Sequence, residues 1–300
     1  MRLSLIYLAL GFAILVVSTS SIMVRFCTAP ALLISFYRVL FTSLLAGTFR
    51  GAKLKDTIAG IERRDFYYIL GAGFFLALHF TFWITSLNYT SISSSVLFTN
   101  LQVIFVLVFS IIFLKEKSSL YVVAGILLAL TGSLLIAHGD LRSGKLLGDM
   151  LALASGFFVA FYFIIGRKVR ARIDTLGYTS IVSAVAALVI FPVCLLSNIS
   201  LSGYPLLDWV LFLLMALFPG VIGHGVFNWA LKYVKAPIVA VSILGESVGA
   251  SILAYIIFGE LLLWYQIIGG ILILIGIYIA ASNEVTRVTG RVTGDGSSVT

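Results

Sequence analysis

Charged residues are scarce in this chain. Asp, Glu, Lys and Arg make up 11% of its 300 residues, whereas an ordinary soluble domain carries about 25%. Hydrophobic residues make up 61%, and the mean hydropathy is +1.13. This composition excludes a soluble globule. Because helices of about 20 apolar residues satisfy their own backbone hydrogen bonds in lipid, it predicts an all-α polytopic membrane protein.

Residues that usually carry enzyme chemistry are scarce too. The two cysteines, Cys27 and Cys194, stand far apart, which excludes metal-ligand and redox spacings. The chain has no G-x-S-x-G, H-E-x-x-H or P-loop sequence. A membrane-embedded enzyme such as a lipid-modifying hydrolase would need a nucleophile or a metal set, and His79, His224 and Glu246 do not form one. We therefore predict no enzymatic activity, no catalytic residue, no metal and no cofactor.

The net charge of +8 does not indicate a nucleic-acid partner. Basic residues lie in short loops between apolar runs, without a basic face of interleaved aromatic residues, and in such loops they act as topology signals. If the N-terminus is cytoplasmic, sixteen Lys and Arg fall in cytoplasmic segments, and only Arg25, Arg142 and Lys145 fall outside, with Arg38 inside a helix. We therefore predict a multi-pass protein of the cytoplasmic cell membrane with both termini in the cytoplasm.

Ten apolar runs are long enough to cross a bilayer. The first continues through Ile22-Met-Val24, which is long for the apolar core of a signal peptide, so we predict a retained helix. After Ala281 the chain turns polar, and residues 283–300 are predicted to form a disordered cytoplasmic tail. The ten predicted spans are Leu3–Val24, Ala29–Phe49, Tyr67–Leu87, Ser91–Leu114, Ser119–Ala137, Gly148–Gly166, Gly177–Ser197, Asp208–Leu231, Pro237–Phe258 and Leu263–Ala281.

The two halves of the chain repeat one another. A shift of 144 residues places Leu87–Ala137 on Leu231–Ala281 without a gap. Each repeat holds five helices, and because five is odd, the halves enter the membrane in opposite senses. We therefore predict a 5+5 inverted-topology repeat with halves 1–140 and 141–282, a plan common in secondary transporters, whose sites lie near the midplane. The matched residues include Tyr121 and Tyr265, Glu116 and Glu260, Gly125 and Gly269, and Gly132 and Gly276.

Three motifs resemble the drug/metabolite transporter superfamily, and within it the EamA-type ten-helix members. They are Ser35-Phe-Tyr-Arg38, the Phe-x-x-Glu ending Phe113–Glu116 with its shorter repeat Phe258–Glu260, and Leu244–Ala250, which is close to the family's Glu-Pro-Val-x-Ala. Ser247 stands where the family usually has proline, and the neighbouring Gly245 and Gly249 could supply the bend instead.

This resemblance implies an exporter of small metabolites that works by alternating access. It also implies a central cavity lined mainly by helices 1, 3, 4, 6, 8 and 9. The substrate stays open, since members of the superfamily handle amino acids, nucleosides, sugars and drugs. The resemblance covers residues 1 to about 282, so each half is identified as an EamA-type repeat.

Glu246 is the acid that lies deep inside a membrane-length apolar run. A carboxylate at that depth costs about 2.5–3.5 kcal/mol to insert, so such residues usually face a polar cavity and serve function. Glu246 could be a counter-charge for a substrate amine or a proton carrier. It could equally be a structural carboxylate that holds the ninth helix to a neighbour.

Further candidates follow from helical spacing and from the repeat. His79 and Trp83 share a stripe on the third helix, and His224 and Asn228 share one on the eighth, although each histidine could simply bond a backbone carbonyl. Gln102 is the repeat counterpart of Glu246. The predicted substrate-binding residues are His79, Trp83, Asn100, Gln102, Tyr162, His224, Asn228 and Glu246.

Some of these candidates have a structural alternative. Asn100 and Gln102 could instead make hydrogen bonds between helices, worth about 0.6 kcal/mol on average. Tyr162 enters as part of an aromatic cage for a planar substrate, together with Trp83, Phe158, Phe227 and Trp229.

Three charged residues are assigned gating or structural roles. Glu116 and Glu260 end helices beside loops, so we interpret them as gate or cap residues. Arg38 lies within the second helix, where a structural ion pair is the first interpretation and binding of a substrate carboxylate the second. The repeated glycines are typical of close helix packing or of a dimer face.

The sequence thus predicts a secondary transporter that exports a small metabolite such as an amino acid, with an aromatic one as an option. The alternatives are a transporter or exchanger of a nucleoside, sugar or drug, and further a non-transport scaffold or a lipid scramblase. The predicted partners are a small-molecule substrate and the lipid bilayer. Proton coupling and a homodimer both stay open.

Overall fold

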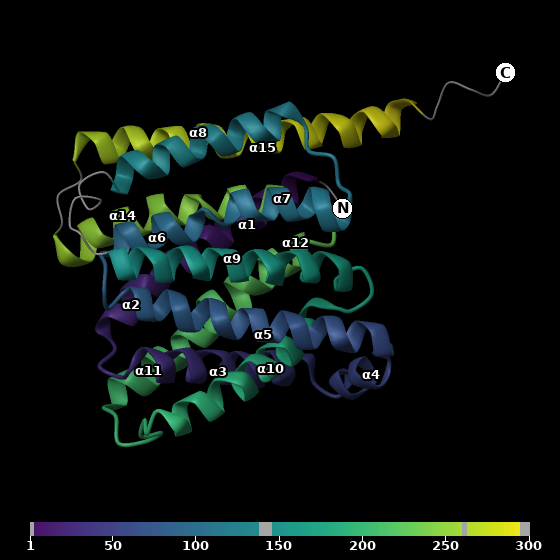
Figure 1. Cartoon of the computed structure of the whole chain (residues 1–300). Coiled ribbons are helices and arrows are strands. Elements are labelled where there is room, and N and C mark those ends of the chain that lie inside the picture. Colours follow the sequence, from purple (N-terminus) through teal and green to yellow (C-terminus); the bar gives the residue numbers. More distant parts are fainter. Residues whose placement is uncertain (1–2, 138–145, 260–262, 295–300) are drawn as a thin grey trace.

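The computed structural model describes residues 3–137, 146–259 and 263–294, and within them the chain is helical, with no strand. Long helices lie side by side in one bundle (Figure 1). This confirms the predicted all-α membrane class. The helices are α1 (Leu3–Val17), α2 (Thr19–Phe26), α3 (Ala31–Arg50), α4 (Lys53–Ala59), α5 (Arg63–Ser86), α6 (Ile92–Asn100), α7 (Gln102–Leu114), α8 (Leu120–Ala137), α9 (Leu146–Val169), α10 (Thr175–Leu196), α11 (Leu206–Met215), the π-helical η1 (Ala216–His224), α12 (Gly225–Ala230), α13 (Ala236–Ile243), α14 (Gly245–Phe258) and α15 (Trp264–Gly294).

Nine spans in the described chain are long and apolar enough to cross a membrane. The remaining predicted span, Ser119–Ala137, corresponds to α8, whose apolar part Leu120–Ile136 is shorter than any of the nine. The count of ten therefore stays a prediction, as do the inverted repeat and the division at residue 140. The nine spans are Ser4–Phe26, Ala31–Arg50, Arg63–Ser86, Ser94–Leu114, Leu146–Val169, Thr175–Leu196, Leu206–Ala230, Ala236–Ile257 and Trp264–Ala281.

Helix α15 continues past the last apolar span, Trp264–Ala281, and ends at Gly294. The disordered tail from residue 283 stays a prediction. Adding residues to an existing helix avoids the unfavourable nucleation step, so a polar segment can extend a helix that the membrane span has already formed.

Four of the spans are interrupted inside the membrane. Single residues separate α1 from α2 at Ser18, α6 from α7 at Leu101, and α13 from α14 at Leu244. The hydroxyl of Ser18 donates to the carbonyl of Ile14 at 2.7 Å, a bond that often bends helices. In the fourth interruption, η1 contains Pro219, which lacks the N–H of a regular turn.

Two of these interruptions occupy matching places in the proposed halves. Leu101 shifted by 144 residues falls on Gly245, directly after the break at Leu244. The bend expected in the ninth span is therefore present beside Gly245, without the proline usual in relatives. Gln102 and Glu246 follow the two breaks, so both candidate residues lie where the helix direction changes.

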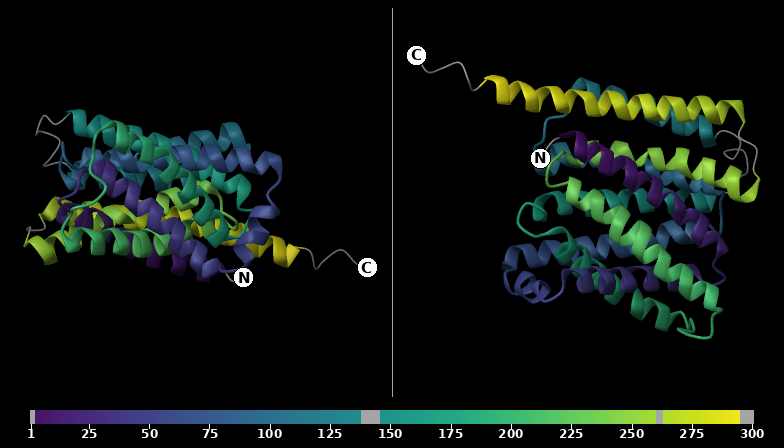
Figure 2. Two further views of the ribbon diagram at one scale, coloured as in Figure 1. Left: turned by 90° about the horizontal axis from the view of Figure 1, so that it is seen from below. Right: turned by 180° about the vertical axis from the view of Figure 1, so that it is seen from behind.

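Helices α8 and α15 run side by side at one edge of the bundle (Figures 1 and 2). A Cβ built on Gly125 would lie 2.5 Å from the Gly276 carbonyl, and one built on Gly276 would lie 2.5 Å from the Gly125 carbonyl. Gly132 and Gly269 meet in the same reciprocal way. Only glycine permits this backbone approach. These four glycines therefore serve helix packing within one chain rather than a dimer face.

Candidate functional site

A cavity of about 40 Å³ lies in the middle of the bundle. In the numbering of the ten predicted spans, helices 1, 3, 4, 6, 8 and 9 line the cavity, as the family resemblance implies. The second span adds Arg38. Its volume leaves room for only a few water-sized groups. The lining residues are Val17, Ser20, Arg38, His79, Phe80, Trp83, Val96, Thr99, Asn100, Gln102, Val159, Phe163, His224, Phe227, Ile243 and Glu246.

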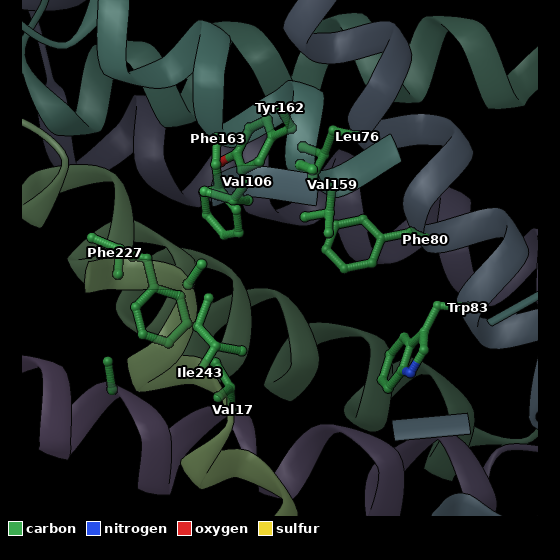
Figure 3. Close-up of a cluster of buried hydrophobic side chains, with 14 of the residues drawn as sticks. Val17, Leu76, Phe80, Trp83, Val106, Val159, Tyr162, Phe163, Phe227 and Ile243 are labelled. Atoms are coloured by element: carbon green, nitrogen blue, oxygen red, sulfur yellow. The ribbon is translucent and has the colours of Figure 1, made fainter. Parts of the chain in front are cut away.

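Apolar side chains form much of the wall. Phe80 and Trp83 come from α5, while Phe227 and Ile243 come from α12 and α13 on the other side of the cluster (Figure 3). Trp83 is 5% exposed and Phe227 is 1% exposed. Charged and polar groups that reach this cavity are therefore surrounded by low-dielectric material, which strengthens their electrostatic interactions.

Arg38 reaches the cavity from α3 and is buried, at 2% exposure. Its Nη1 donates to the Ser20 hydroxyl at 2.8 Å, and its guanidinium carbon lies 4.1 Å from the ring centre of Phe80 and 5.6 Å from that of Trp83. Its Nε has no hydrogen-bond partner in the described chain. A hydroxyl and two aromatic faces thus hold the guanidinium, and no carboxylate of the described residues lies within 4.0 Å of it, so the structural ion pair of Arg38 stays a prediction.

Glu246 lies in the first turn of α14 and lines the same cavity. Its backbone carbonyl accepts a hydrogen bond from Ser18 at 3.4 Å. Among the described residues, its carboxylate has neither a hydrogen-bond partner nor a cation within 4.0 Å. The cavity thus holds one positive and one negative side chain that are not paired with each other.

The two membrane histidines lie next to each other. The ring centres of His79 and His224 are 6.4 Å apart, and Phe80 lies 5.4 Å from His224. The Nδ1 atom of His79 lies 2.8 Å from the Ser155 hydroxyl and 3.3 Å from the Ser155 carbonyl. His224 Nδ1 is buried without a partner in the part of the chain that the structure describes. Ser155 therefore orients His79, whereas His224 keeps a free ring nitrogen.

Asn100 and Gln102 differ in their bonding. Asn100 Nδ2 donates to the Ser247 hydroxyl at 3.0 Å, which is the interhelix hydrogen bond considered as its structural alternative. Gln102, at 3% exposure, has no described partner for its Oε1 atom. Gln102 and Glu246, the predicted repeat counterparts, line the same cavity.

Tyr162 and Asn228 lie outside this cavity. The Tyr162 hydroxyl is 2.9 Å from Oδ1 and 2.6 Å from Nδ2 of Asn228, and both residues are buried. Tyr162 instead borders a second space of about 10 Å³, which His224 and Phe80 share with the central cavity. The structure thus brings together six of the eight predicted substrate-binding residues and leaves these two bonded to each other.

The aromatic cage is only partly formed. Trp83 and Phe227 line the cavity, but Phe158 stacks with Phe75 and packs against Phe82, and Trp229 packs against Tyr233. Sequence reasoning did not single out Ser20, Thr99 or Phe163, which line the cavity, nor Ser155, which binds His79. Small hydroxyl residues and phenylalanines are frequent in this chain, so no signal in the sequence separated these from the others.

Glu116 takes part in an ion-pair cluster at the end of the bundle that is predicted to be cytoplasmic. Its carboxylate accepts a hydrogen bond from Arg167 Nε at 3.0 Å and another from the Ser110 hydroxyl at 3.1 Å. Arg167 also donates to the backbone carbonyl of Leu231, where α12 ends. Glu116 and Arg167 together thus join the ends of α7, α9 and α12. Glu260, its predicted counterpart, lies outside the described residues.

Two more ion pairs lie at this end, and we call the three together the cytoplasmic ion-pair cluster after the predicted orientation. Arg172 Nε donates to Asp65 at 2.6 Å, and Arg50 Nε lies 3.0 Å from Asp174. The hydrogen bond with Asp65 raises the pKa of Arg172 above its ordinary value. All three pairs join residues 1–140 to residues 141–282. Among the described residues, no three His, Cys, Asp or Glu side chains are grouped to hold a metal ion.

Comparisons with known proteins agree with this architecture. A model of the EamA-like transporter family matches residues 3–138 and again residues 146–282. The uncharacterized transporter YyaM of Bacillus subtilis is 28% identical over 221 residues, covering 71% of this chain and 70% of that protein. An uncharacterized transporter of Archaeoglobus fulgidus is 25% identical over 258 residues, covering 84% of this chain and 88% of its own. A crystal structure of a protein with 20% identity superposes with a TM-score of 0.72 over 90% of this chain and 96% of that chain, which supports the fold.

Proposed function

This chain belongs to the EamA-like transporter family, and from that premise we propose that it exports a small zwitterionic metabolite, an amino acid, across the cytoplasmic membrane. The single observation that carries the proposal is the cavity with one cation and one anion, Arg38 and Glu246, neither of which forms an ion pair within 4.0 Å with a described residue. An amino acid carries the two complementary charges, a carboxylate and an ammonium group. Each would find its counter-charge in a water-poor site, where charge-assisted hydrogen bonds are strong.

The walls of the cavity support an apolar or aromatic side chain on the substrate. Trp83, Phe163 and Phe227 line it and offer faces and edges for ring packing. Gln102 and His224 offer hydrogen-bonding atoms that no described residue uses. Buried polar atoms without partners are costly, so a ligand that satisfies them gains binding energy.

Alternating access between two inverted halves is the proposed mechanism. The reciprocal glycine contacts of α8 and α15 support the repeat, because the 144-residue shift exchanges the pair Gly125 and Gly276 with the pair Gly269 and Gly132. The matching breaks near Leu101 and Leu244 supply places where the two central helices can bend. The cytoplasmic ion-pair cluster and the small cavity correspond to a form in which the site is closed toward the cytoplasm.

Transport would then need the cytoplasmic ion-pair cluster to separate. Substrate enters between the halves from the cytoplasm, the halves rock around it, and the outer side opens. Proton coupling through Glu246 or the histidines stays an alternative to facilitated flux. With both termini in the cytoplasm, the three ion pairs face the side from which an exported substrate arrives.

The test is reconstitution into liposomes with labelled amino acids, nucleosides and sugars, with and without a pH gradient. We expect saturable flux of at least one amino acid and no saturation with nucleosides or sugars. Saturable flux of another solute class alone would remove the amino-acid assignment. If no solute moves saturably while fluorescent lipids exchange between leaflets, the scramblase alternative is favoured over transport.

A further inference from the structure

A second, larger hollow lies on the outside of the bundle, where α1, α14 and α15 meet. Its volume is about 790 Å³, and it is separate from the central cavity in its lining residues. We call it the outer groove and define it by Tyr7, Gly11, Gly245, Gly249, Ile252 and Tyr278. Nothing in the proposed transport cycle uses it.

The outer groove exists because α15 packs mainly along α8 and only lightly against α1 and α14. In the view from behind, the yellow α15 lies along one edge, and α1, in purple, crosses close to α14 (Figure 2). Gly11 deepens the hollow, since a Cβ built there would meet no atom within 4 Å. The empty space is therefore a property of the helix arrangement and of a missing side chain.

The chemistry of the groove excludes a polar ligand. Its lining is almost entirely aliphatic or aromatic, with Leu8 and Leu15 among its exposed members. Two hydroxyl groups in the groove already donate hydrogen bonds to backbone carbonyls. The Tyr7 hydroxyl donates to Ala281 at 3.1 Å, and the Ser242 hydroxyl donates to Ile238 at 2.9 Å. A hydrocarbon ligand therefore loses no hydrogen bonds when it enters the groove, whereas a polar ligand would lose its hydrogen bonds with water.

The length of the groove distinguishes an acyl chain from another protein helix. Along α1 it extends from Tyr7 to Leu15, which at 1.5 Å per residue is about 12 Å. One leaflet of a hydrocarbon core about 30 Å thick measures about 15 Å. A neighbouring membrane helix would need a contact surface along the full thickness of the hydrocarbon core, whereas one acyl chain runs only from the headgroups to the midplane.

We propose that the outer groove binds one acyl chain of a phospholipid from the cytoplasmic leaflet. With the N-terminus in the cytoplasm, the end marked by Tyr7 and Tyr278 lies at the headgroups, where tyrosine is favoured. Tyr278 is 73% exposed and free to meet a headgroup. The bound chain fills the space that Gly11 leaves and packs against the α14 face that carries Gly245 and Gly249.

The bound lipid also lies behind one wall of the central cavity. Helices α1 and α14 separate the two spaces, and the Ser18 hydroxyl reaches the Glu246 carbonyl between them. Lipid in the groove therefore supports the helix pair that holds Glu246.

The proposal is tested by the phospholipid that remains on the purified protein. Wild type, Gly11→Ala and Gly11→Phe are extracted in mild detergent and examined by native mass spectrometry and by phosphorus content. We expect wild type and Gly11→Ala to retain phospholipid and Gly11→Phe to lose at least half of it. Leu127→Phe is the matched control, because Leu127 is exposed on α8 away from the groove and should change nothing.

A second measurement uses phospholipids with a spin label on the acyl chain in reconstituted wild type. A motionally restricted fraction that shrinks in Gly11→Phe supports the proposal. Equal retention and equal restriction in all variants would overturn it. Efficient cross-linking between copies through Gly11→Cys, in a background without Cys27 and Cys194, would overturn it in favour of a second copy. These readouts do not depend on transport, so the proposed function can fail separately.

Discussion

The guanidinium of Arg38 and the carboxylate of Glu246 line one cavity without forming an ion pair. Arg38 is held by Ser20 and by the faces of Phe80 and Trp83. Arg38 is buried and Glu246 half-buried, and two opposite charges that stay apart leave room for a ligand that bridges them, which is how a zwitterion would bind.

Removing either charge should weaken amino-acid transport by about 10-fold to 100-fold in kcat/KM, because a charge-assisted hydrogen bond is worth about 1.5–3 kcal/mol. We expect this loss in Arg38→Gln and in Glu246→Gln, measured as initial flux in proteoliposomes. The two variants should differ in their inhibitors. Amines that lack a carboxylate should inhibit amino-acid flux in Arg38→Gln as well as they do in wild type. Carboxylates that lack an amine should inhibit flux in Glu246→Gln as well as they do in wild type.

A neutral variant of the cavity wall provides the control. Val96→Ala removes apolar contact but no charge, so it should change affinity less than either charge variant. If Arg38→Gln transports amino acids with unchanged kcat/KM, the guanidinium is structural and the zwitterion assignment is lost. An unchanged pH profile of flux in Glu246→Gln would eliminate a proton-carrier role for that residue.

Tyr162 supplies a second prediction, because the structure bonds it to Asn228 outside the cavity. Tyr162→Phe removes the hydrogen bond to the Asn228 side chain. It should lower the free energy of unfolding by about 1 kcal/mol, the usual net value of one hydrogen bond. The substrate KM should stay unchanged. Thermal unfolding in detergent and flux in proteoliposomes measure the two effects. A large rise in KM without a loss of stability would return Tyr162 to the binding site.

How far the sequence predicts this molecule depends on the kind of feature. The apolar runs predict the spans because burial in lipid demands length and hydrophobicity, which sequence shows directly. The repeated glycines predict close packing because no other residue allows the contact between Gly125 and Gly276. Helical spacing places His79 and Trp83 on one cavity-lining stripe.

The rest depends on helix rotation and bending, which a pattern does not contain. Tyr162 lies on a cavity helix, but its hydroxyl turns to Asn228. Arg38 was expected to pair with a carboxylate, yet its partner is a hydroxyl that no motif marks. The break at Ser18 and the π-helical turns before His224 decide which side chains reach the cavity. Each results from competition between tertiary packing and the regular helix.

The pair Glu116 and Arg167 should resist opening toward the cytoplasm. Arg167→Gln removes the ion pair and weakens the bond to the Leu231 carbonyl. We expect a loss of about 1 kcal/mol in stability, since the pair is partly exposed. We also expect faster labelling of a cysteine introduced at Val106, which is buried below this end. The double variant Glu116→Arg with Arg167→Glu exchanges the two charges and so tests the pairing itself. It should restore part of the lost stability and part of the slow labelling of the cysteine. Equal labelling in all variants would show that the pair does not close this side.

The last prediction concerns Asp174, which caps the start of α10. Its Oδ1 accepts the Gly177 N–H at 3.0 Å, and its Oδ2 lies 3.1 Å from the Thr57 hydroxyl and 3.0 Å from Arg50 Nε. Burial acts to raise the pKa of Asp174, but the bonds from Gly177 and Thr57 and the charge of Arg50 outweigh it. The pKa therefore lies below the ordinary value of 3.8.

A carboxyl whose pKa is lowered by folding stabilises the protein above its ordinary pKa, and the contribution is lost as the pH falls through the folded value. Asp174→Asn keeps the cap acceptor but removes the charge. It should lower the Tm at pH 6, and the difference from wild type should shrink as the pH falls below 3.8. Asp174→Ala loses the cap as well, about 1 kcal/mol, so its deficit should persist in acid. A deficit of Asp174→Asn that is the same at every pH would mean that the charge of Asp174 contributes nothing to the fold.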